Sequence, residues 1–216
     1  MKKTTGGFRR AAWGLALGLG VAACGGSHSS GPSGGHAFLL EHNARFNDGR
    51  TVRWPSLPIV VSLGGVATAD EVTAWTGATG GAVTFAFVGS APSNSISIRG
   101  RSGTDVCGVS TVFFDEDGTI TSADIRVSTA VYRGPQCVRT VTHEIGHAIG
   151  FLNHTADGGL MDDDGGDGSF TPEVTRMIRD LYALPPGTAV AAQKRRGTEL
   201  RSGGRRSMTF VYPVRP

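Results

Sequence analysis

Two histidines four residues apart constrain this chain more than any other feature of its sequence. His143 and His147 lie in residues 138–152, which contain no proline and carry apolar residues at helical spacing. On a helix, side chains four positions apart lie on one face, one turn from each other. Both imidazoles can therefore reach a single point, so residues 138–152 are predicted to be a helix that forms one wall of a site.

The residue types around this pair suit a metal ion. Imidazole nitrogens bind Zn²⁺ at about 2.0–2.1 Å, and a catalytic zinc site has three protein ligands and one position open for water. Glu144 follows His143 directly and lies about 100° further around the helix, so its carboxylate can approach that water without binding the metal. It would act there as a general base and pass the proton to a leaving amine. The alternative is a surface helix that carries these residues incidentally.

Residues 143–154, with the sequence HEIGHAIGFLNH, resemble the zinc-binding signature HExxHxxGxxH of metzincin peptidases, especially the matrixin-like branch. In that family the glycine ends the helix and lets the chain turn back to deliver the third histidine, and Gly150 occupies this position. The spacing departs by one residue, because the third position of the signature falls on Asn153 and the histidine follows as His154. Asparagine is a poor zinc ligand, and one more residue in a turn costs little. We therefore expect His154 to be the third ligand, with Asp157 as the alternative.

The resemblance covers residues 53–184 and implies further features. Met161, in the sequence GLMD, matches the methionine turn whose thioether packs beneath the metal in that family, which differs little from ordinary core packing. An antiparallel edge strand ahead of the active-site helix would bind the substrate backbone by strand addition, and residues 120–128 or the strand before them would be that edge. The implied activity is zinc-dependent endopeptidase cleavage of protein or peptide substrates. The specificity pocket is expected between the active-site helix and residues 161–170.

Local patterns predict an α+β domain over residues 51–186, and the resemblance implies that it is the zinc peptidase domain. Capping signals predict helix starts at Thr68, with Glu71 three residues later, and at Thr171, which Pro172 follows. The expected strands are residues 59–63, 82–89, 95–99, 109–114 and 120–128, and the expected helices are residues 68–78, 138–152 and 171–184. Together with the resemblance, this order implies a metzincin-like catalytic domain, a twisted mixed sheet with an active-site helix and a C-terminal helix.

Residues 1–24 have the pattern of an export signal. A cationic stretch precedes about a dozen apolar residues, fewer than the roughly 20 that span a bilayer. Their end, VAAC, resembles the lipobox of bacterial lipoproteins, in which the cysteine, here Cys24, is lipidated; an ordinary secretory signal is the alternative. Residues 25–50 begin with a Gly/Ser-rich stretch that suits a tether. We expect a cell-envelope lipoprotein at the outer membrane or the outer face of the cell membrane or, without lipid, a secreted protein.

The remaining cysteines, Cys107 and Cys137, form an even pair once Cys24 carries lipid. Disulfides persist in exported proteins, so we expect a Cys107–Cys137 bond. It would close a loop of about 30 residues and stabilise the fold by roughly 3–4 kcal/mol. Two separate buried thiols are the alternative, and neither cysteine has the CxxC spacing of a metal site.

The net charge of +3 is unevenly distributed along the chain. Residues 1–24 carry +4 and residues 187–216 carry +6, which leaves −7 on residues 25–186. The acidic body has no basic stripe interleaved with aromatic residues, so we expect a monomer without a nucleic-acid partner. Residues 187–216 are a basic C-terminal extension, in which residues 193–206 are predicted to be solvated or, alternatively, attracted to anionic lipid or cell-wall polymer. Residues 208–214 (MTFVYPV) have strand composition but no predicted position.

Two acidic loops offer carboxylates to a hard cation. Residues 162–164 with Asp167 are acidic and followed by glycine, and residues 115–117 resemble the acidic loops that hold calcium in matrixins, so Ca²⁺ is a second candidate metal. A solvated loop at the first position and an ordinary hairpin turn at the second are the alternatives.

The sequence also indicates how such an enzyme would be controlled and which other function the chain could have. No segment between Cys24 and residue 51 resembles the matrixin latency peptide with its zinc-blocking cysteine, so control by localisation or by an inhibitor is expected. The second functional hypothesis is a catalytically idle, metal-binding surface lipoprotein that binds peptide or carbohydrate. Glu144 discriminates between the two, because a binding protein needs no base beside its metal. We therefore favour the peptidase.

Overall fold

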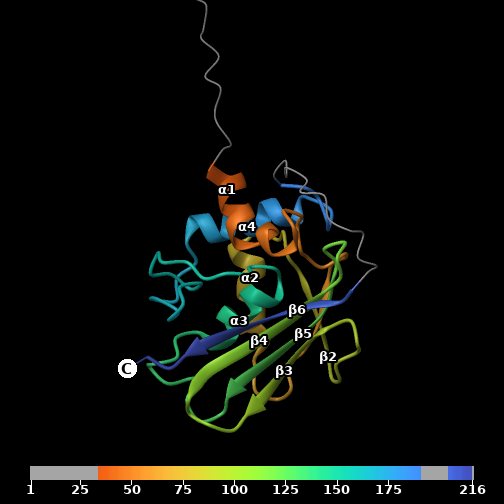
Figure 1. Cartoon of the computed structure of the whole chain (residues 1–216). Helices are drawn as coiled ribbons and strands as arrows, with labels where there is room; N and C mark the ends of the chain where they lie inside the picture. Colours follow the sequence, from red (N-terminus) through yellow and green to blue (C-terminus); the bar gives the residue numbers. More distant parts are fainter. Residues whose placement is uncertain (1–33, 191–203, 216) are drawn as a thin grey trace, which may run out of the picture. The chain divides into compact units, whose positions relative to one another are not determined.

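The computed structural model describes residues 34–190 and 204–215, which contain a mixed six-stranded sheet and helices (Figure 1). The helices are α1 (Gly34–His42), the 3₁₀ helix η1 (Ala44–Asn47), α2 (Ala69–Ala78), α3 (Thr140–Ala148) and α4 (Pro172–Tyr182). The strands are β1 (Ile59–Ser62), β2 (Phe85–Val88), β3 (Ile96–Arg101), β4 (Val106–Phe114), β5 (Ile120–Ser128) and β6 (Arg206–Pro213). The coarse α+β class predicted from the sequence is confirmed.

The strand order of the sheet is β2-β1-β3-β5-β4-β6. Strands β1, β2, β3 and β5 run parallel to one another, whereas β4 is antiparallel to β5 and β6 is antiparallel to β4. The turn between β4 and β5 closes with a hydrogen bond from the Gly118 N–H to the Asp115 carbonyl at 2.8 Å. Helix α3 packs against β4, β5 and β6. The residues that α3 carries therefore face the antiparallel end of the sheet.

Capping and glycine signals set the ends of two helices. Helix α2 starts with the predicted capping box, in which the Thr68 hydroxyl accepts from the Glu71 N–H and the Glu71 carboxylate accepts from the Thr68 N–H. Helix α3 is shorter than predicted and ends at Ala148, because Gly150 has a φ of +110°. A Cβ at Gly150 would also lie 2.7 Å from the Val52 carbonyl oxygen. Only glycine fits this turn without strain.

The folded part begins before residue 51, the boundary predicted from the sequence. Helices α1 and η1 lie within residues 25–50, and Leu39 is 1% exposed in the core. The Leu152 N–H, in the turn after α3, donates to the carbonyl of His42 at 2.6 Å. Composition misses this segment because α1 has nine residues and no amphipathic stripe. Such a short helix is held by its tertiary contacts and not by its own propensity.

Residues 206–213 form a strand of the sheet, which gives the strand composition of residues 208–214 a position and removes Arg206 from the predicted solvated stretch. β6 pairs with β4 over its whole length, and Thr111 and Thr209, 98 positions apart, share a hydrogen bond. Basic residues at both ends of β6 contact the acidic body, since Arg206 pairs with Asp48 and Arg215 with Asp164. Composition could not show this, because strand pairing at such a sequence separation depends on register and not on local pattern.

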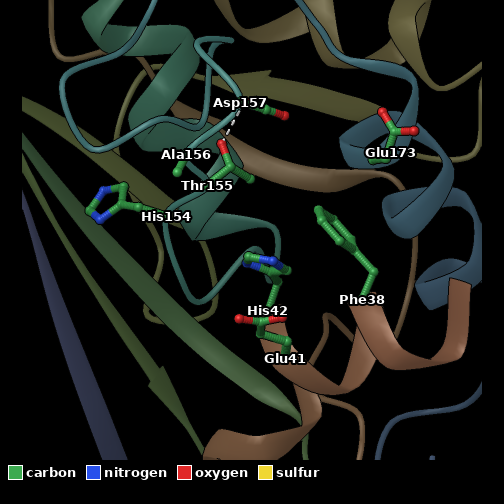
Figure 2. Close-up of a pocket in the computed structure, with 8 residues that line it drawn as sticks. All are labelled: Phe38, Glu41, His42, His154, Thr155, Ala156, Asp157 and Glu173. Carbon is green, nitrogen blue, oxygen red and sulfur yellow. Dashed lines mark hydrogen bonds between the residues drawn. The ribbon is translucent and has the colours of Figure 1, made fainter. Parts of the chain in front are cut away.

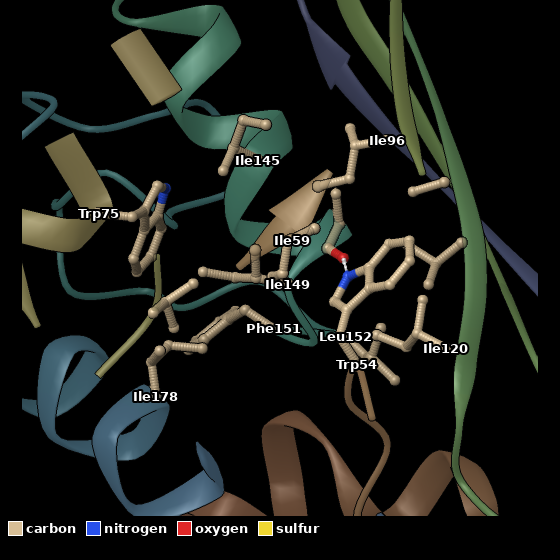
Figure 3. Packing of buried hydrophobic residues seen from close by; sticks show 14 of the residues in the cluster. Trp54, Ile59, Trp75, Ile96, Ile120, Ile145, Ile149, Phe151, Leu152 and Ile178 are labelled. Carbon is tan, nitrogen blue, oxygen red and sulfur yellow. Dashed lines mark hydrogen bonds between the residues drawn. The ribbon is translucent and has the colours of Figure 1, made fainter. Parts of the chain in front are cut away.

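The main hydrophobic core lies between the sheet and the helices (Figure 3). Trp54, Trp75 and Ile145 belong to it, and none is more than 4% exposed. Each indole N–H also donates to a carbonyl of α3 at 2.8 Å, that of Trp75 to Thr142 and that of Trp54 to Ala148. The core therefore holds α3 near both of its ends.

Some predictions concern residues outside the described ranges. Cys24 and the export signal of residues 1–24 lie there, as do residues 191–203 of the basic extension. Within the described ranges, no helix combines the length and apolarity needed to cross a membrane.

Candidate metal centre

Helix α3 and the turn after it bring three histidines together. The Nε2 atom of His147 lies 3.2 Å from the Nε2 atoms of both His143 and His154. His143 and His147 are completely buried, and His154 is partly buried. The structure therefore places His154, and not Asn153, with the pair on α3.

Backbone carbonyls fix the position of the proton on two of these rings. Nδ1 of His143 lies 2.6 Å from the Leu160 oxygen, and Nδ1 of His147 lies 2.7 Å from the Phe151 oxygen. A carbonyl oxygen can only accept a hydrogen bond, so each Nδ1 carries the proton and each Nε2 presents a lone pair. Burial lowers the pKa of both rings, that of His143 to about 3, so both stay neutral near pH 7.

Converging lone pairs repel one another unless a cation lies between them. Two ligands held at about 2.05 Å by a tetrahedral ion are roughly 3.3 Å apart, close to the 3.2 Å between the Nε2 atoms. The donor chemistry and the spacing both fit, so this group of histidines could hold a metal ion. The carbonyls of Leu160 and Phe151 keep the rings in the orientation that a metal requires.

Side chains from three separate segments hold the turn that carries His154 back to α3. The last carbonyls of a helix have no partner within it. Here Trp54 Nε1 donates to the Ala148 oxygen at 2.8 Å, the Tyr182 hydroxyl to the Ile149 oxygen at 3.0 Å, and Asn43 Nδ2 to the Gly150 oxygen at 2.7 Å. Asn43 also bonds to both backbone groups of Val52. The position of the third histidine therefore depends on a residue 107 positions before Gly150, which no local pattern indicates.

Asp157, the alternative third ligand, is engaged elsewhere. Its carboxylate accepts hydrogen bonds from the Thr155 hydroxyl at 2.7 Å, the Gly159 N–H at 3.0 Å and the Thr171 hydroxyl at 2.8 Å. It is not part of the histidine group. Its role in the structure is to tie the loop after α3 to the start of α4.

Glu144 is completely buried, and neither of its carboxylate oxygens has a hydrogen-bond partner among the described residues. Burial raises the pKa of this carboxyl group well above its ordinary value. A Cβ on Gly108 of β4 would lie 2.6 Å from Glu144 Oε1, so Gly108 leaves the space that the carboxylate occupies. A buried carboxyl group without a partner costs free energy. Such a group is typical of a functional site.

Met161 packs against α3 at the level of its histidines. It is completely buried, and its carbonyl accepts from the Thr155 N–H at 2.8 Å. Gly146, one helical turn after His143, leaves room for it, because a Cβ there would collide with the Met161 sulfur and lie 2.7 Å from the Trp75 ring. The thioether therefore fills an apolar space behind the part of α3 that carries the ligands.

Two aromatic side chains of β6 cover the histidines. Phe210 stacks on His147 with ring centroids 4.1 Å apart, and Tyr212 stacks on His143 at 4.3 Å. The Tyr212 hydroxyl donates to the Val138 carbonyl at 2.8 Å. Sequence reasoning missed both residues, as it missed Asn43. The available signal was their alternation in MTFVYPV, which is typical of a strand with one aromatic face.

A cavity of about 410 Å³ lies beside His154 (Figure 2). It is lined by Phe38, Glu41 and His42 of α1, by residues 154–157 and by Glu173 of α4. None of residues 161–170 lines it, so it is not the specificity pocket that the sequence predicted. Helix α1, which the predicted domain boundary excludes, forms one of its walls.

One of the two acidic loops brings its carboxylates together. Oxygen atoms of Asp162, Asp163 and Asp164 lie within 4.8 Å of one another at a partly exposed position. In residues 115–117, which the structure also describes, no such group forms, and Asp117 accepts from the Thr119 N–H at 2.8 Å within the turn. Exposed acidic groups are common without an ion, so the first loop alone is no argument for calcium.

Cys107 and Cys137 form the predicted disulfide. Cys107 precedes Gly108 on β4, and Cys137 lies three residues before α3 begins. The strand that faces Glu144 is therefore joined covalently to the segment that leads into the helix carrying it.

The three histidines define a candidate metal centre, which lies on a helix beside the antiparallel end of a mixed sheet. No protein-family model and no curated protein sequence matches the chain.

Proposed function

We propose that the chain is a monomeric zinc-dependent endopeptidase of the metzincin type, acting on protein or peptide substrates. The observation that carries the proposal is the group of His143, His147 and His154 with Glu144 buried and unpartnered beside it. A site that only stored a metal would gain nothing from such a carboxyl group, whose burial costs free energy. The antiparallel β4 beside otherwise parallel strands supports the same proposal, because it is the antiparallel strand ahead of the active-site helix that the family resemblance implies. The expectation that residues 120–128 or the strand before them form an edge of the sheet is wrong, because β5 lies between β3 and β4, and β6 pairs with the other side of β4.

The three Nε2 atoms would hold zinc, which when bound polarises a substrate carbonyl and lowers the pKa of water. The carbonyls of Leu160 and Phe151 keep two of the rings oriented. Glu144 accepts a proton from the attacking water and delivers it to the leaving amine nitrogen.

Strand β4 would bind the substrate backbone. Gly108, Ser110 and Val112 lie on its buried face, toward α3. An extended peptide paired with β4 in the antiparallel sense would therefore pass across the histidines. The cavity beside His154 would accept one side chain of that peptide, and Glu41 and Glu173 give its lining negative charge.

Export and lipid anchoring through Cys24 are part of the proposal, and the VAAC sequence supports them. In a bacterial host, Cys24→Ala should abolish labelling by palmitate and release the protein from the membrane fraction. Unchanged labelling and fractionation would contradict the anchor.

A second candidate function is peptide or carbohydrate binding by a catalytically idle metal protein. Burial favours it, because His143, Glu144 and His147 are each 0% exposed. A centre covered in this way cannot receive a substrate unless the covering strand moves. Peptide cleavage by an uncovered site discriminates between the two functions.

The test compares the zinc-loaded chain from Ser27 onward with its Glu144→Gln variant on casein and a mixed peptide library. We expect cleavage by the parent, loss of roughly 100-fold or more in the variant, inhibition by a chelator and recovery on addition of zinc. Equal zinc content in the two proteins would show that the variant lacks the base and not the metal. Equal cleavage by both would refute the role of Glu144.

The ligand set has its own test in zinc content. His154→Ala should lose the metal, whereas Asn153→Ala should retain it. The reverse pattern would overturn His154 as the third ligand.

A further inference from the structure

We propose that β6 is an intramolecular inhibitor, in which the chain's own C-terminal strand occupies the peptide-binding edge of β4 and closes the metal centre until it is displaced. This rests on the proposed peptidase function, because the occupied edge is the one that a substrate would use. Control then comes from within the chain, in contrast to the localisation or separate inhibitor that the sequence suggests.

The backbone of β6 takes the place of an extended peptide. It pairs with β4 in the antiparallel sense from Arg206 to Pro213. Phe210 lies opposite Ser110, and Tyr212 lies opposite Gly108, on the face of β4 that is turned toward α3. A substrate strand added to β4 would need the same backbone groups and the same space. The two cannot be bound together.

The side chains of β6 block the metal ligands directly. The rings of Phe210 and His147 are inclined by 7°, and those of Tyr212 and His143 by 20°, so each aromatic ring covers a face of one imidazole. Phe210 also lies edge-on to His154, with centroids 6.4 Å apart. One strand therefore contacts all three rings of the histidine group.

The surface under β6 is poorly suited to permanent burial. Five buried side-chain polar atoms in the described residues have no hydrogen-bond partner, and three of them lie here: Ser110 Oγ and both carboxylate oxygens of Glu144. Ser110 pairs with Phe210, and Glu144 packs against Gly108, which pairs with Tyr212. Each unpartnered atom costs free energy while the strand is docked. Release of β6 gives these atoms access to water or to a peptide, which favours opening.

Partly exposed ion pairs hold the two ends of β6, and Arg215 Nε also donates to the Asp164 carbonyl at 2.7 Å. Arg206 pairs with Asp48 at 3.2 Å and Arg215 with Asp164 at 3.4 Å, and both aspartate side chains are more than half exposed. Exposed ion pairs of this kind are screened by salt and contribute little individually. The outer face of the strand, with Val211, is exposed. The strand is therefore attached through its inner face, which carries Phe210 of the main core and the buried Tyr212.

A cross-link tests the proposal in the full chain from Ser27 onward. Thr111 and Thr209 pair directly across β4 and β6, with their hydroxyl oxygens 3.0 Å apart on the outer face. A T111C/T209C disulfide would therefore lock β6 in place. The two measurements are peptide hydrolysis and the rate at which a chelating dye removes zinc. We expect this engineered disulfide, the lock, to lower the rates of peptide hydrolysis and of zinc removal by roughly tenfold or more. A mild reductant should restore both rates.

Two controls accompany the lock. T209C alone should behave as the parent does. The parent treated with the same reductant reports any effect of reducing the Cys107–Cys137 bond.

The Phe210→Ala/Tyr212→Ala double variant tests the opposite direction. Loss of both ring stacks should raise peptide hydrolysis and the zinc-removal rate by roughly tenfold. Thr209→Ala/Val211→Ala changes the outer face of the same strand and is the matched control, with an expected change below about twofold. The lock remains informative even if the double variant folds poorly.

Peptide hydrolysis tests the proposed peptidase, and the rate of zinc removal tests closure of the site by β6. If the lock slows zinc removal and the double variant speeds it while no variant cuts peptide, closure by β6 stands and the peptidase is refuted. If peptide is cleaved and the locked chain works at the parent's rate, β6 is a permanent part of the domain and the inhibitor proposal is overturned.

Discussion

The two segments that reach the candidate metal centre from outside the predicted domain differ in how they are attached. On one side, α1 and η1 contribute buried residues, and Asn43 makes three hydrogen bonds to the backbone of Val52 and Gly150. On the other side, β6 buries alternate side chains, Phe210 and Tyr212, and leaves its outer face exposed. Both segments position or cover a ligand.

The two segments differ in whether they provide hydrogen-bond partners for the buried polar groups that they contact. Asn43 satisfies backbone groups that would otherwise be buried without partners, whereas β6 covers Ser110 and Glu144 without satisfying them. Because a buried polar group without a partner costs about 1–3 kcal/mol, the first segment stabilises the domain and the second opposes part of its own binding. The N-terminal segment is part of the fold, and β6 resembles a bound ligand.

The largest effect is expected for Asn43→Ala. The substitution leaves three buried backbone groups without partners and should lower the unfolding free energy by about 3–5 kcal/mol. It should also weaken metal binding, because the turn that delivers His154 loses a support. Urea unfolding and zinc titration measure the two effects. Asn153→Ala, in the same turn, is the control, with an expected change below about 0.5 kcal/mol.

Ending the chain at residue 190 should have a smaller effect than that single substitution. Burial of Phe210 and Tyr212 favours the docked strand, whereas ordering its eight residues costs conformational entropy. Backbone pairing offsets much of that cost, so we expect a net loss below about 2 kcal/mol. A loss larger than that of Asn43→Ala in urea unfolding would reverse the comparison.

The two segments should respond to opposite ends of the pH range. Burial lowers the pKa of His42 in α1, so its contribution to stability is present above about pH 6.5 and falls as the pH drops below that value. Burial raises the pKa of Tyr212 in β6 from 10.0 to about 12, so its contribution is present below pH 10 and falls as the pH rises toward 12.

Matched variants isolate these two groups in urea unfolding. His42→Gln should lose less stability than the parent between pH 7.5 and 5.5. Tyr212→Phe should lose about 1 kcal/mol less than the parent between pH 9 and 11. Identical pH profiles for the parent and both variants would contradict the lowered pKa of His42 and the raised pKa of Tyr212.

The smallest effect is expected for Val211→Ala on the exposed face of β6. Its side chain is 47% exposed, so the unfolding free energy should change by less than about 0.5 kcal/mol. A larger loss in thermal or urea unfolding would indicate that the outer face of the strand also carries contacts.

Sequence reasoning predicted correctly the features that depend on residues close together in the chain. The capping box at Thr68 and the helix with His143 and His147 depend on residues within a few positions of one another, and both are present. Glu144 adjoins the first histidine and is buried beside it, whereas its role as a base stays a prediction. The length of α3 was overestimated because its end depends on the contact of Gly150 with Val52.

Sequence reasoning did not predict the features that depend on contacts between residues far apart in the chain. The contribution of Asn43 depends on a carbonyl 107 positions away, and in isolation a buried asparagine has the pattern of a turn residue. Strand β6 pairs with residues 106–114, and a basic, glycine-rich approach to it has the composition of a tail. The need for a glycine at position 108 follows from the side chain of Glu144, which no local rule connects to it.

The disulfide beside Gly108 has a consequence for when the site becomes complete. Cys107 on β4 and Cys137 ahead of α3 are joined by a bond that persists only in an oxidising compartment. Before oxidation, nothing covalent sets the spacing between the strand that accommodates Glu144 and the segment leading into its helix. Under the proposed export, maturation of the site therefore has an order, in which the chain first leaves the reducing interior and then acquires the link between strand and helix.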